Sequence, residues 1–123
     1  MGSKIRIGIV GPCSAGKSTL IAGLKQYDYQ VKHIAQEHSY VPDMWQRLTN
    51  PDILIYLDVS FPMSMQRRKL NWTIEDYIEQ VNRLQHARRH ANFYLHTDSC
   101  SIQKVLQEVL EYLKTVDPSS QNG

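Results

Sequence analysis

The sequence has few cysteines, only Cys13 and Cys100 among 123 residues. Two thiols cannot build a disulfide framework, and Cys13 lies in a glycine-containing loop where a structural crosslink would be awkward. Long apolar runs are also absent, since no stretch approaches the roughly 20 residues that a membrane-spanning helix needs. The first residues follow a strand pattern in place of a signal peptide. We therefore expect a cytoplasmic protein that does not enter a membrane.

An excess of one charge is absent as well. Fourteen Lys and Arg residues against 12 Asp and Glu residues give a formal net charge of +2. This balance argues against a nucleic-acid binder and against an acidic interaction tail. The apolar content of 41% is enough for one buried core in a chain of this length. We expect one domain over residues 1–116 and a disordered polar tail over 117–123.

Segments with a strand pattern alternate along the chain with segments of helical periodicity. The strand pattern occurs at 4–10, 30–35, 53–59 and 93–96. Helical periodicity occurs from about residue 16, over 42–48, 63–70 and 73–91, and from residue 99 or 101 onward. This alternation predicts an α/β fold, a three-layer sandwich with a short, mostly parallel sheet of about four strands and helices on both faces. The carboxyl ends of such strands share one edge, where ligands bind.

Residues 11–19, GPCSAGKST, match the pattern G-x-x-x-x-G-K-[ST] between a predicted strand and a predicted helix. Glycines in this pattern let backbone N–H groups surround phosphate oxygens, the lysine reaches the terminal phosphates, and the hydroxyl holds Mg²⁺. A glycine turn that merely joins strand to helix is the alternative, but it leaves Lys17 unexplained. The predicted nucleotide-binding residues are Gly11, Ser14, Ala15, Gly16, Lys17, Ser18 and Thr19.

The motif and the layout resemble the P-loop NTPases, and more narrowly the branch that contains thymidylate, deoxynucleoside and shikimate kinases. PDILIYLDVSFP (51–62) resembles the strand before the lid of thymidylate kinases. MSMQRRK (63–69) resembles the arginine-bearing lid helix, and FYLHTDS (93–99) resembles the last strand of that group. The resemblance implies Mg²⁺-dependent binding of ATP or GTP, with hydrolysis or phosphoryl transfer to a small-molecule acceptor. A guanine-selecting N/T-K-x-D motif is absent, which favours ATP.

The chain departs from this family between Trp45 and Pro51. There the family carries its substrate-binding insert and the strand that supplies the metal-linked acid. If that strand is missing, we expect the strand ending at Ala35 to lie directly beside the first strand. Glu37 would then lie near the terminal phosphate, where it could hold Mg²⁺ or orient an attacking water. Asp58 is a second candidate for this role. Alternatively, its side chain caps a helix or forms a hydrogen bond to a neighbouring loop.

The other catalytic candidates are basic. Lys17 belongs to the phosphate loop, and the resemblance implies that Arg67 and Arg68 act from a lid on the charge of the transferring phosphoryl group. A solvated basic helix end is the alternative for both arginines. The candidate Mg²⁺ ligands are Ser18, Glu37 and Asp58.

A second hypothesis is a nucleotide-binding switch that does not hydrolyse its ligand, or does so slowly. The missing insert favours this switch hypothesis, because few residues would enclose an acceptor molecule. Nucleotide would order the lid and residues 36–45, and a partner or a second copy of the chain would read that state. The segment HSYVPDMW (38–45) suits a flat ligand, and equally a hydrophobic anchor or a dimer contact. An adduct on Cys13 would make nucleotide binding redox-sensitive.

Overall fold

The computed structural model describes residues 5–68 and 73–116, and the predicted tail 117–123 lies outside them. The strands are β1 (Arg6–Val10), β2 (Gln30–His33), β3 (Ile53–Asp58) and β4 (Phe93–His96). The helices are α1 (Lys17–Lys25), α2 (Met44–Leu48), α3 (Phe61–Arg68), α4 (Ile74–Arg83), α5 (Gln85–His90) and α6 (Ile102–Val116), and a 3₁₀ turn, η1, covers Gln36–His38. None of the helices in these two ranges has both the length and the apolar character needed to cross a bilayer.

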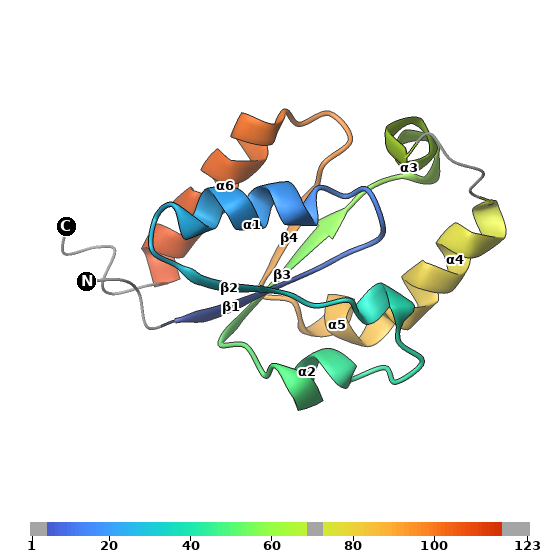
Figure 1. The fold of residues 1–123 in the computed structure, drawn as a ribbon, viewed down its shortest axis with the longest axis horizontal. Helices are drawn as coiled ribbons and strands as arrows, with labels where there is room; N and C mark the ends of the chain where they lie inside the picture. The colour runs from blue at the N-terminus through green and yellow to red at the C-terminus, as the bar shows by residue number, and fades with distance from the viewer. Residues whose placement is uncertain (1–4, 69–72, 117–123) are drawn as a thin grey trace.

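The strands form one parallel sheet in the order β2-β1-β3-β4 (Figure 1). The predicted α/β fold with four parallel strands is confirmed, and so is the expected position of β2 beside β1, in which Ile7 is opposite Val31. On its other side β1 pairs with β3, with Ile9 opposite Ile55. The strand order reverses direction at β1 and β3, and the carboxyl ends of these two strands therefore flank the crevice where doubly wound sheets bind ligands.

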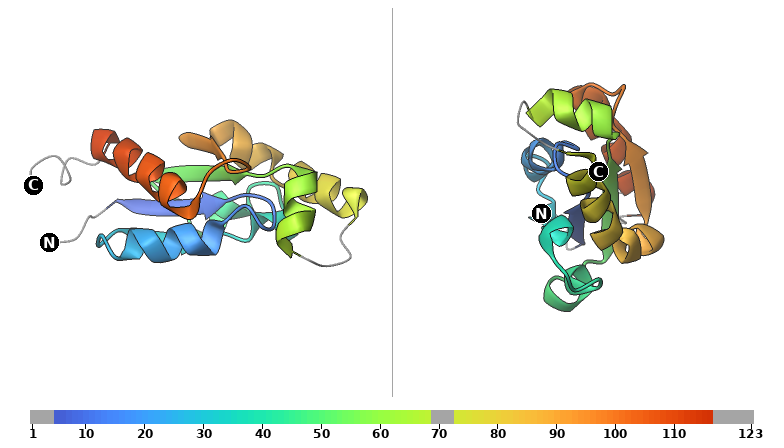
Figure 2. Two further views of the ribbon diagram at one scale, coloured as in Figure 1. Left: turned by 90° about the horizontal axis from the view of Figure 1, so that it is seen from above. Right: turned by 90° about the vertical axis from the view of Figure 1, so that its right-hand side faces the viewer.

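Helices cover both faces of the sheet. In Figure 1, α1 and α6 lie above the sheet, while α2 and α5 lie below it. The core under α1 and α6 includes Ile9, Leu24 and Val109, and the core on the other face includes Trp45 and Tyr56. Both faces of β3 are buried, which explains its continuous apolar sequence. The helices α3 and α4 lie beyond the carboxyl ends of the strands (Figure 2), so they are placed to border a site at that edge.

The segment 73–91 is not the single helix that its periodicity predicts. It breaks at the buried Leu84 into α4 and α5. Ile74 and Ile78 are exposed, and the buried residue of α4 is Gln80. The physical reason is the position of α4, which contacts η1 and the loop after β1 rather than the apolar face of the sheet. Thr73 and Asp76 form a capping box at the N-terminus of this helix.

Candidate functional site

The loop between β1 and α1 has a backbone that its glycines make possible. Gly11 has φ +153°, and a Cβ added there would lie 2.0 Å from the backbone oxygen of Leu57. Ser14 and Gly16 have φ values of 71° and 97°, in the left-handed region that disfavours side chains. The close approach of Leu57 therefore requires glycine at position 11, and the left-handed turns lead the chain into the first turn of α1.

Backbone N–H groups of this loop remain available to a ligand. Cys13 N donates to Gln80 Oε1 at 3.0 Å, and Ala15 N donates to Pro12 O at 3.3 Å. Within residues 5–68 and 73–116, no acceptor is present for the backbone N–H groups of Ser14, Gly16, Lys17, Ser18 and Thr19. These donors are at the N-terminus of α1, where the helix dipole favours an anion.

Lys17 and Glu37 form a buried ion pair at the floor of the site. Lys17 Nζ lies 2.8 Å from Glu37 Oε2 and also donates to the carbonyl oxygens of Gly11 and Pro12. Lys17 is 6% exposed and Glu37 is 2% exposed. Glu37 Oε1 is buried, and no hydrogen-bond partner for it occurs among the described residues. The expectation that Glu37 would approach the phosphate loop is confirmed.

Gln36 holds Glu37 in this position. Its amide nitrogen donates to the carbonyl oxygens of Val41 at 2.8 Å and Arg83 at 3.3 Å, and its amide oxygen accepts from Trp45 N at 2.9 Å. Arg83 Nη1 donates to the backbone oxygen of Glu37 at 3.3 Å. A fully buried glutamine therefore joins the turn after β2 to α2 and α4.

A cavity of about 370 Å³ opens in front of the ion pair. It is lined by residues 13, 14 and 16–19 of the loop, and by His33, Glu37 and His38. Burial, and then the positive charge of Lys17, lower the pKa of His33. A second, mostly apolar cavity of about 300 Å³ lies against α1 and α6, and three residues line both cavities: Ser14, Gly16 and Thr19. A ligand with a phosphate at one end could therefore place an apolar group in the neighbouring cavity.

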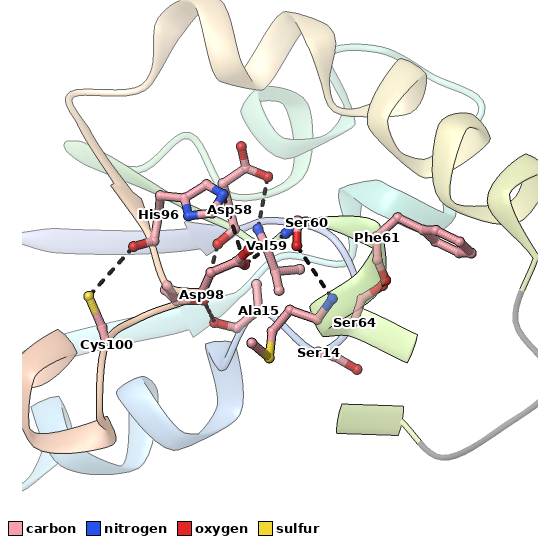
Figure 3. A network of polar contacts seen from close by, with 12 residues as sticks. Ser14, Ala15, Asp58, Val59, Ser60, Phe61, Ser64, His96, Asp98 and Cys100 are labelled. Carbon is pink, nitrogen blue, oxygen red and sulfur yellow. Dashed lines mark hydrogen bonds and ion pairs between the residues drawn. The ribbon is translucent and has the colours of Figure 1, made fainter. Parts of the chain in front are cut away.

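Asp58 is not brought to Lys17 and Glu37. Its Oδ2 accepts from Tyr94 OH at 2.5 Å, and its Oδ1 accepts from Val59 N at 2.9 Å. In Figure 3 its carboxylate points away from the segment that carries Ser14. The structure thus pairs the Asp58 side chain with the neighbouring strand β4 and with the backbone of the next residue.

Arg67 is the lid candidate that reaches the loop. Its Nη1 donates to Ser14 O at 2.9 Å and to Thr97 Oγ1 at 3.1 Å, and its Nη2 donates to Thr97 O at 2.8 Å. Ser60 N donates to Asp98 Oδ1 at 2.9 Å, which joins the loops after β3 and β4 (Figure 3). The side chain of Arg68 lies outside the described residues. Arg67 therefore ties the predicted phosphate loop to the loop after β4.

Sequence reasoning missed Gln80. Its side chain is buried, its Oε1 accepts from Cys13 N, and its Nε2 lies 3.1 Å from Cys13 Sγ. No motif surrounds it, and only its place on α4 brings it to the site. In the aromatic segment 38–45, Trp45 is buried and donates from Nε1 to His86 Nδ1 at 3.1 Å, whereas Tyr40 is exposed.

Comparisons with known proteins identify no family for this chain. No protein-family model matches the chain, and no curated protein matches it. Among solved structures, the chain is similar to the crystal structure of HP1043, an orphan response regulator of H. pylori. The two share 12% sequence identity at a TM-score of 0.48, over 92% of this chain and 99% of that chain. A similarity at this level transfers no ligand or activity to the present chain.

No family model and no curated protein supports the assignment to the kinase-like branch of the P-loop NTPases, and this assignment is corrected. The predictions that rested on this assignment are corrected as well. They are hydrolysis of ATP or GTP, phosphoryl transfer to a small acceptor, and slow hydrolysis by a switch. The geometry gives a physical reason for this correction. Glu37, the candidate for holding Mg²⁺ or orienting an attacking water, is already paired with Lys17, and Asp58 faces Tyr94.

Proposed function

We propose that this chain is a regulatory domain that binds a phosphate-bearing ligand at residues 11–19 and does not transfer the phosphate. The observation that carries this proposal is the buried ammonium of Lys17, which lies beside the unpaired N–H groups of the loop and lines the cavity of about 370 Å³. A cation, free backbone donors and a helix N-terminus together suit a phosphate group.

Binding competes with the ion pair. A phosphate drawn to Lys17 meets the carboxylate of Glu37, which holds the same ammonium at 2.8 Å. The two anions repel each other in a poorly solvated site, so the ligand weakens the contact between Lys17 and Glu37. The ligand therefore acts on the position of Glu37 without reacting.

The turn that carries Glu37 is connected to the surface. Arg83 of α4 donates to Glu37 O, and Gln36 binds the backbone of Val41 and Trp45. A shift of Glu37 changes these contacts and alters residues 36–41 together with the adjoining end of α4. Such a local electrostatic change with a surface readout is how ligand switches operate.

The ligand carries an apolar part beside its phosphate. The second cavity, which shares Ser14, Gly16 and Thr19 with the first, accepts such a part. ATP and GTP carry an aromatic base, whose flat faces suit an apolar cavity, and they are proposed as the first ligands to test. Ser18 and Glu37 line the cavity and are the proposed ligands of an accompanying Mg²⁺. A homodimer that reads the ligand state is part of the same proposal.

The test is calorimetric titration with ATP, GTP and pyrophosphate, with and without Mg²⁺. We expect binding by the wild type and by Lys25→Met, a change of an exposed lysine in the last turn of α1. Lys17→Met should lose at least about tenfold in affinity, equivalent to ~1.4 kcal/mol. Equal affinity of Lys17→Met and the wild type would overturn the proposal, as would steady phosphate release from ATP or GTP.

Glu37→Gln keeps Lys17 and provides the second variant. It removes the competing negative charge, so it should bind pyrophosphate in the absence of divalent metal about tenfold more tightly than the wild type. Circular dichroism establishes that both variants are folded. Weaker or unchanged pyrophosphate binding by folded Glu37→Gln contradicts the competition between the ligand and Glu37.

A further inference from the structure

We infer that Cys13, Glu37 and His38 form a binding site for a divalent transition metal of the Zn²⁺ class at the wall of the larger cavity. The inference goes beyond the proposed function and needs no phosphate ligand. It also differs from the Mg²⁺ site expected from the sequence, because a thiolate and an imidazole are ligands that Mg²⁺ does not favour.

Three ligand atoms of different chemistry converge there. Sγ of Cys13, an imidazole nitrogen of His38 and a carboxylate oxygen of Glu37 all lie within 4.8 Å of one another. The distance from Cys13 Sγ to His38 Nε2 is 4.0 Å, and from His38 Nε2 to Glu37 Oε2 it is 3.9 Å. Zinc bonds of about 2.0–2.3 Å in a tetrahedron place ligand atoms roughly 3.4–3.7 Å apart. The His38 side chain is 60% exposed, so its ring is free to shorten the two distances that involve Nε2 by about half an ångström, and the Cys13 side chain must turn toward Glu37 to complete the site.

Glu37 supplies an independent observation. Its side chain is 3% exposed, and Oε1 is buried without a hydrogen-bond partner among the described residues. A buried carboxylate oxygen that lacks a donor is costly, and such groups are rare in folded proteins. Lys17 donates to Oε2, the same oxygen that lies 3.9 Å from His38 Nε2, so a cation held by both carboxylate oxygens is needed to give Oε1 a partner. A bound metal ion would satisfy this oxygen.

Gln80 holds Cys13 through two hydrogen bonds, one of them to the sulfur. Its Oε1 accepts from Cys13 N, which fixes the amide, and its Nε2 donates to Cys13 Sγ at 3.1 Å. A donor directed at sulfur stabilises the thiolate, which is the form that binds metal. Gln80 is buried, so this interaction lies away from competing water. It is therefore a positioning residue for the thiolate ligand.

The donor set defines the class of ion. One sulfur, one nitrogen and one oxygen ligand match Zn²⁺ and its spectroscopic substitute Co²⁺, whereas Mg²⁺ and Ca²⁺ require oxygen ligands. Three protein ligands leave a fourth position of the tetrahedron open. That position belongs to the cavity that Cys13, Glu37 and His38 all line, so water or an added anion can occupy it.

Titration of the full chain with Co²⁺ tests the site. We expect a thiolate-to-cobalt charge-transfer band in the near ultraviolet, which Zn²⁺ abolishes and excess Mg²⁺ leaves unchanged. Cys13→Ser should lose the band. Cys100→Ser should keep it, because the Cys100 thiol donates to His96 O elsewhere in the fold. His38→Ala should weaken Zn²⁺ binding at least about tenfold, by removal of one ligand of three.

Several outcomes would overturn the site. They are a wild-type protein without the charge-transfer band, a band that persists in Cys13→Ser, and an unchanged Zn²⁺ affinity in His38→Ala. His38 is exposed, so His38→Ala is expected to fold, and circular dichroism checks both variants. The titration contains no phosphate ligand. Its failure is therefore distinct from a failure of the proposed phosphate binding.

Discussion

Lys17 Nζ donates to Glu37 Oε2 across 2.8 Å, and this contact joins the first turn of α1 to the turn after β2. Both side chains are almost fully buried. Two sequence-distant elements thus meet through opposite charges in a place where water cannot screen them.

The free energy of unfolding should reveal this coupling. Lys17→Met leaves the carboxylate of Glu37 buried and uncompensated, so we expect a loss of about 3–5 kcal/mol. Glu37→Gln in the same chain removes the orphaned charge, and the double variant should regain much of that loss. Urea unfolding of the wild type, both single variants and the double variant gives the coupling energy. Single-variant losses that add to within about 0.5 kcal/mol would show that the two side chains do not interact.

The two glycines of the loop between β1 and α1 should respond differently to alanine. At Gly11 a methyl group would meet the Leu57 carbonyl oxygen at 2.0 Å, and this backbone atom cannot move without disturbing β3. At Gly16 nothing lies within 4 Å, so only the left-handed φ of 97° opposes the change. We expect Gly16→Ala to cost about 1–2 kcal/mol and Gly11→Ala to cost more than about 4 kcal/mol. Denaturant unfolding measures both, and equal losses would refute the close approach at Gly11.

Arg67 should govern the stability of the loop after β4. Lys in its place cannot reproduce the fork that holds Ser14 O and Thr97 O, so Arg67→Lys should cost about 1–2 kcal/mol. Hydrogen exchange at the amides of Thr97 and Cys100, which bind Asp58 O and Thr97 O, should accelerate. Arg47→Lys changes an exposed helix pair and is the matched control. Unaltered exchange in Arg67→Lys would mean that the arginine does not restrain this loop.

The ionisation of Tyr94, on the edge strand β4, should make the stability of the fold depend on pH. Burial, followed by the hydrogen bond and negative charge of Asp58, raise the pKa of Tyr94 to about 12. The folded state thus keeps the phenol proton more tightly than the unfolded chain, whose tyrosine pKa is about 10. The resulting stabilisation is fully present below pH ~10 and is lost as pH rises from ~10 to ~12.

The Tyr94 phenol can be followed by nuclear magnetic resonance of tyrosine-labelled protein. Asp58→Asn should move the Tyr94 midpoint toward 10, because it removes the negative charge that opposes ionisation. A Tyr94 midpoint near 10 in the wild type, or one unmoved by Asp58→Asn, would contradict the contact with Asp58.

The sheet could be predicted because its signals are local. Continuous apolar residues such as Ile53 to Leu57 specify a strand buried on both faces, and the alternation of strands with helices specifies a parallel arrangement. The position of β2 beside β1 followed from the short connection between Trp45 and Pro51, which leaves no room for another strand. Glu37 was thereby placed correctly at the loop.

The remaining contacts depend on tertiary packing that the pattern of residues does not contain. The helical periodicity of 73–91 predicted one helix, but the chain breaks at Leu84, and α4 extends past the end of the sheet and buries Gln80. Asp58 ends its strand as predicted, yet its rotamer is set by Tyr94 on the neighbouring strand. The phosphate motif also led to a kinase assignment, since a short motif describes a loop and not the protein that contains it.

Gln36 has a consequence for how much the loop between β2 and α2 can vary in sequence. One amide side chain supplies two donors and an acceptor to three different backbone groups, so it acts as a template for the whole segment. A carboxylate of the same size would place oxygen against the carbonyls of Val41 and Arg83. Exposed neighbouring positions such as Tyr40 do not require a particular side chain in this way. Distant relatives of this chain are therefore better sought by an amide at position 36 than by the composition of the loop that follows it.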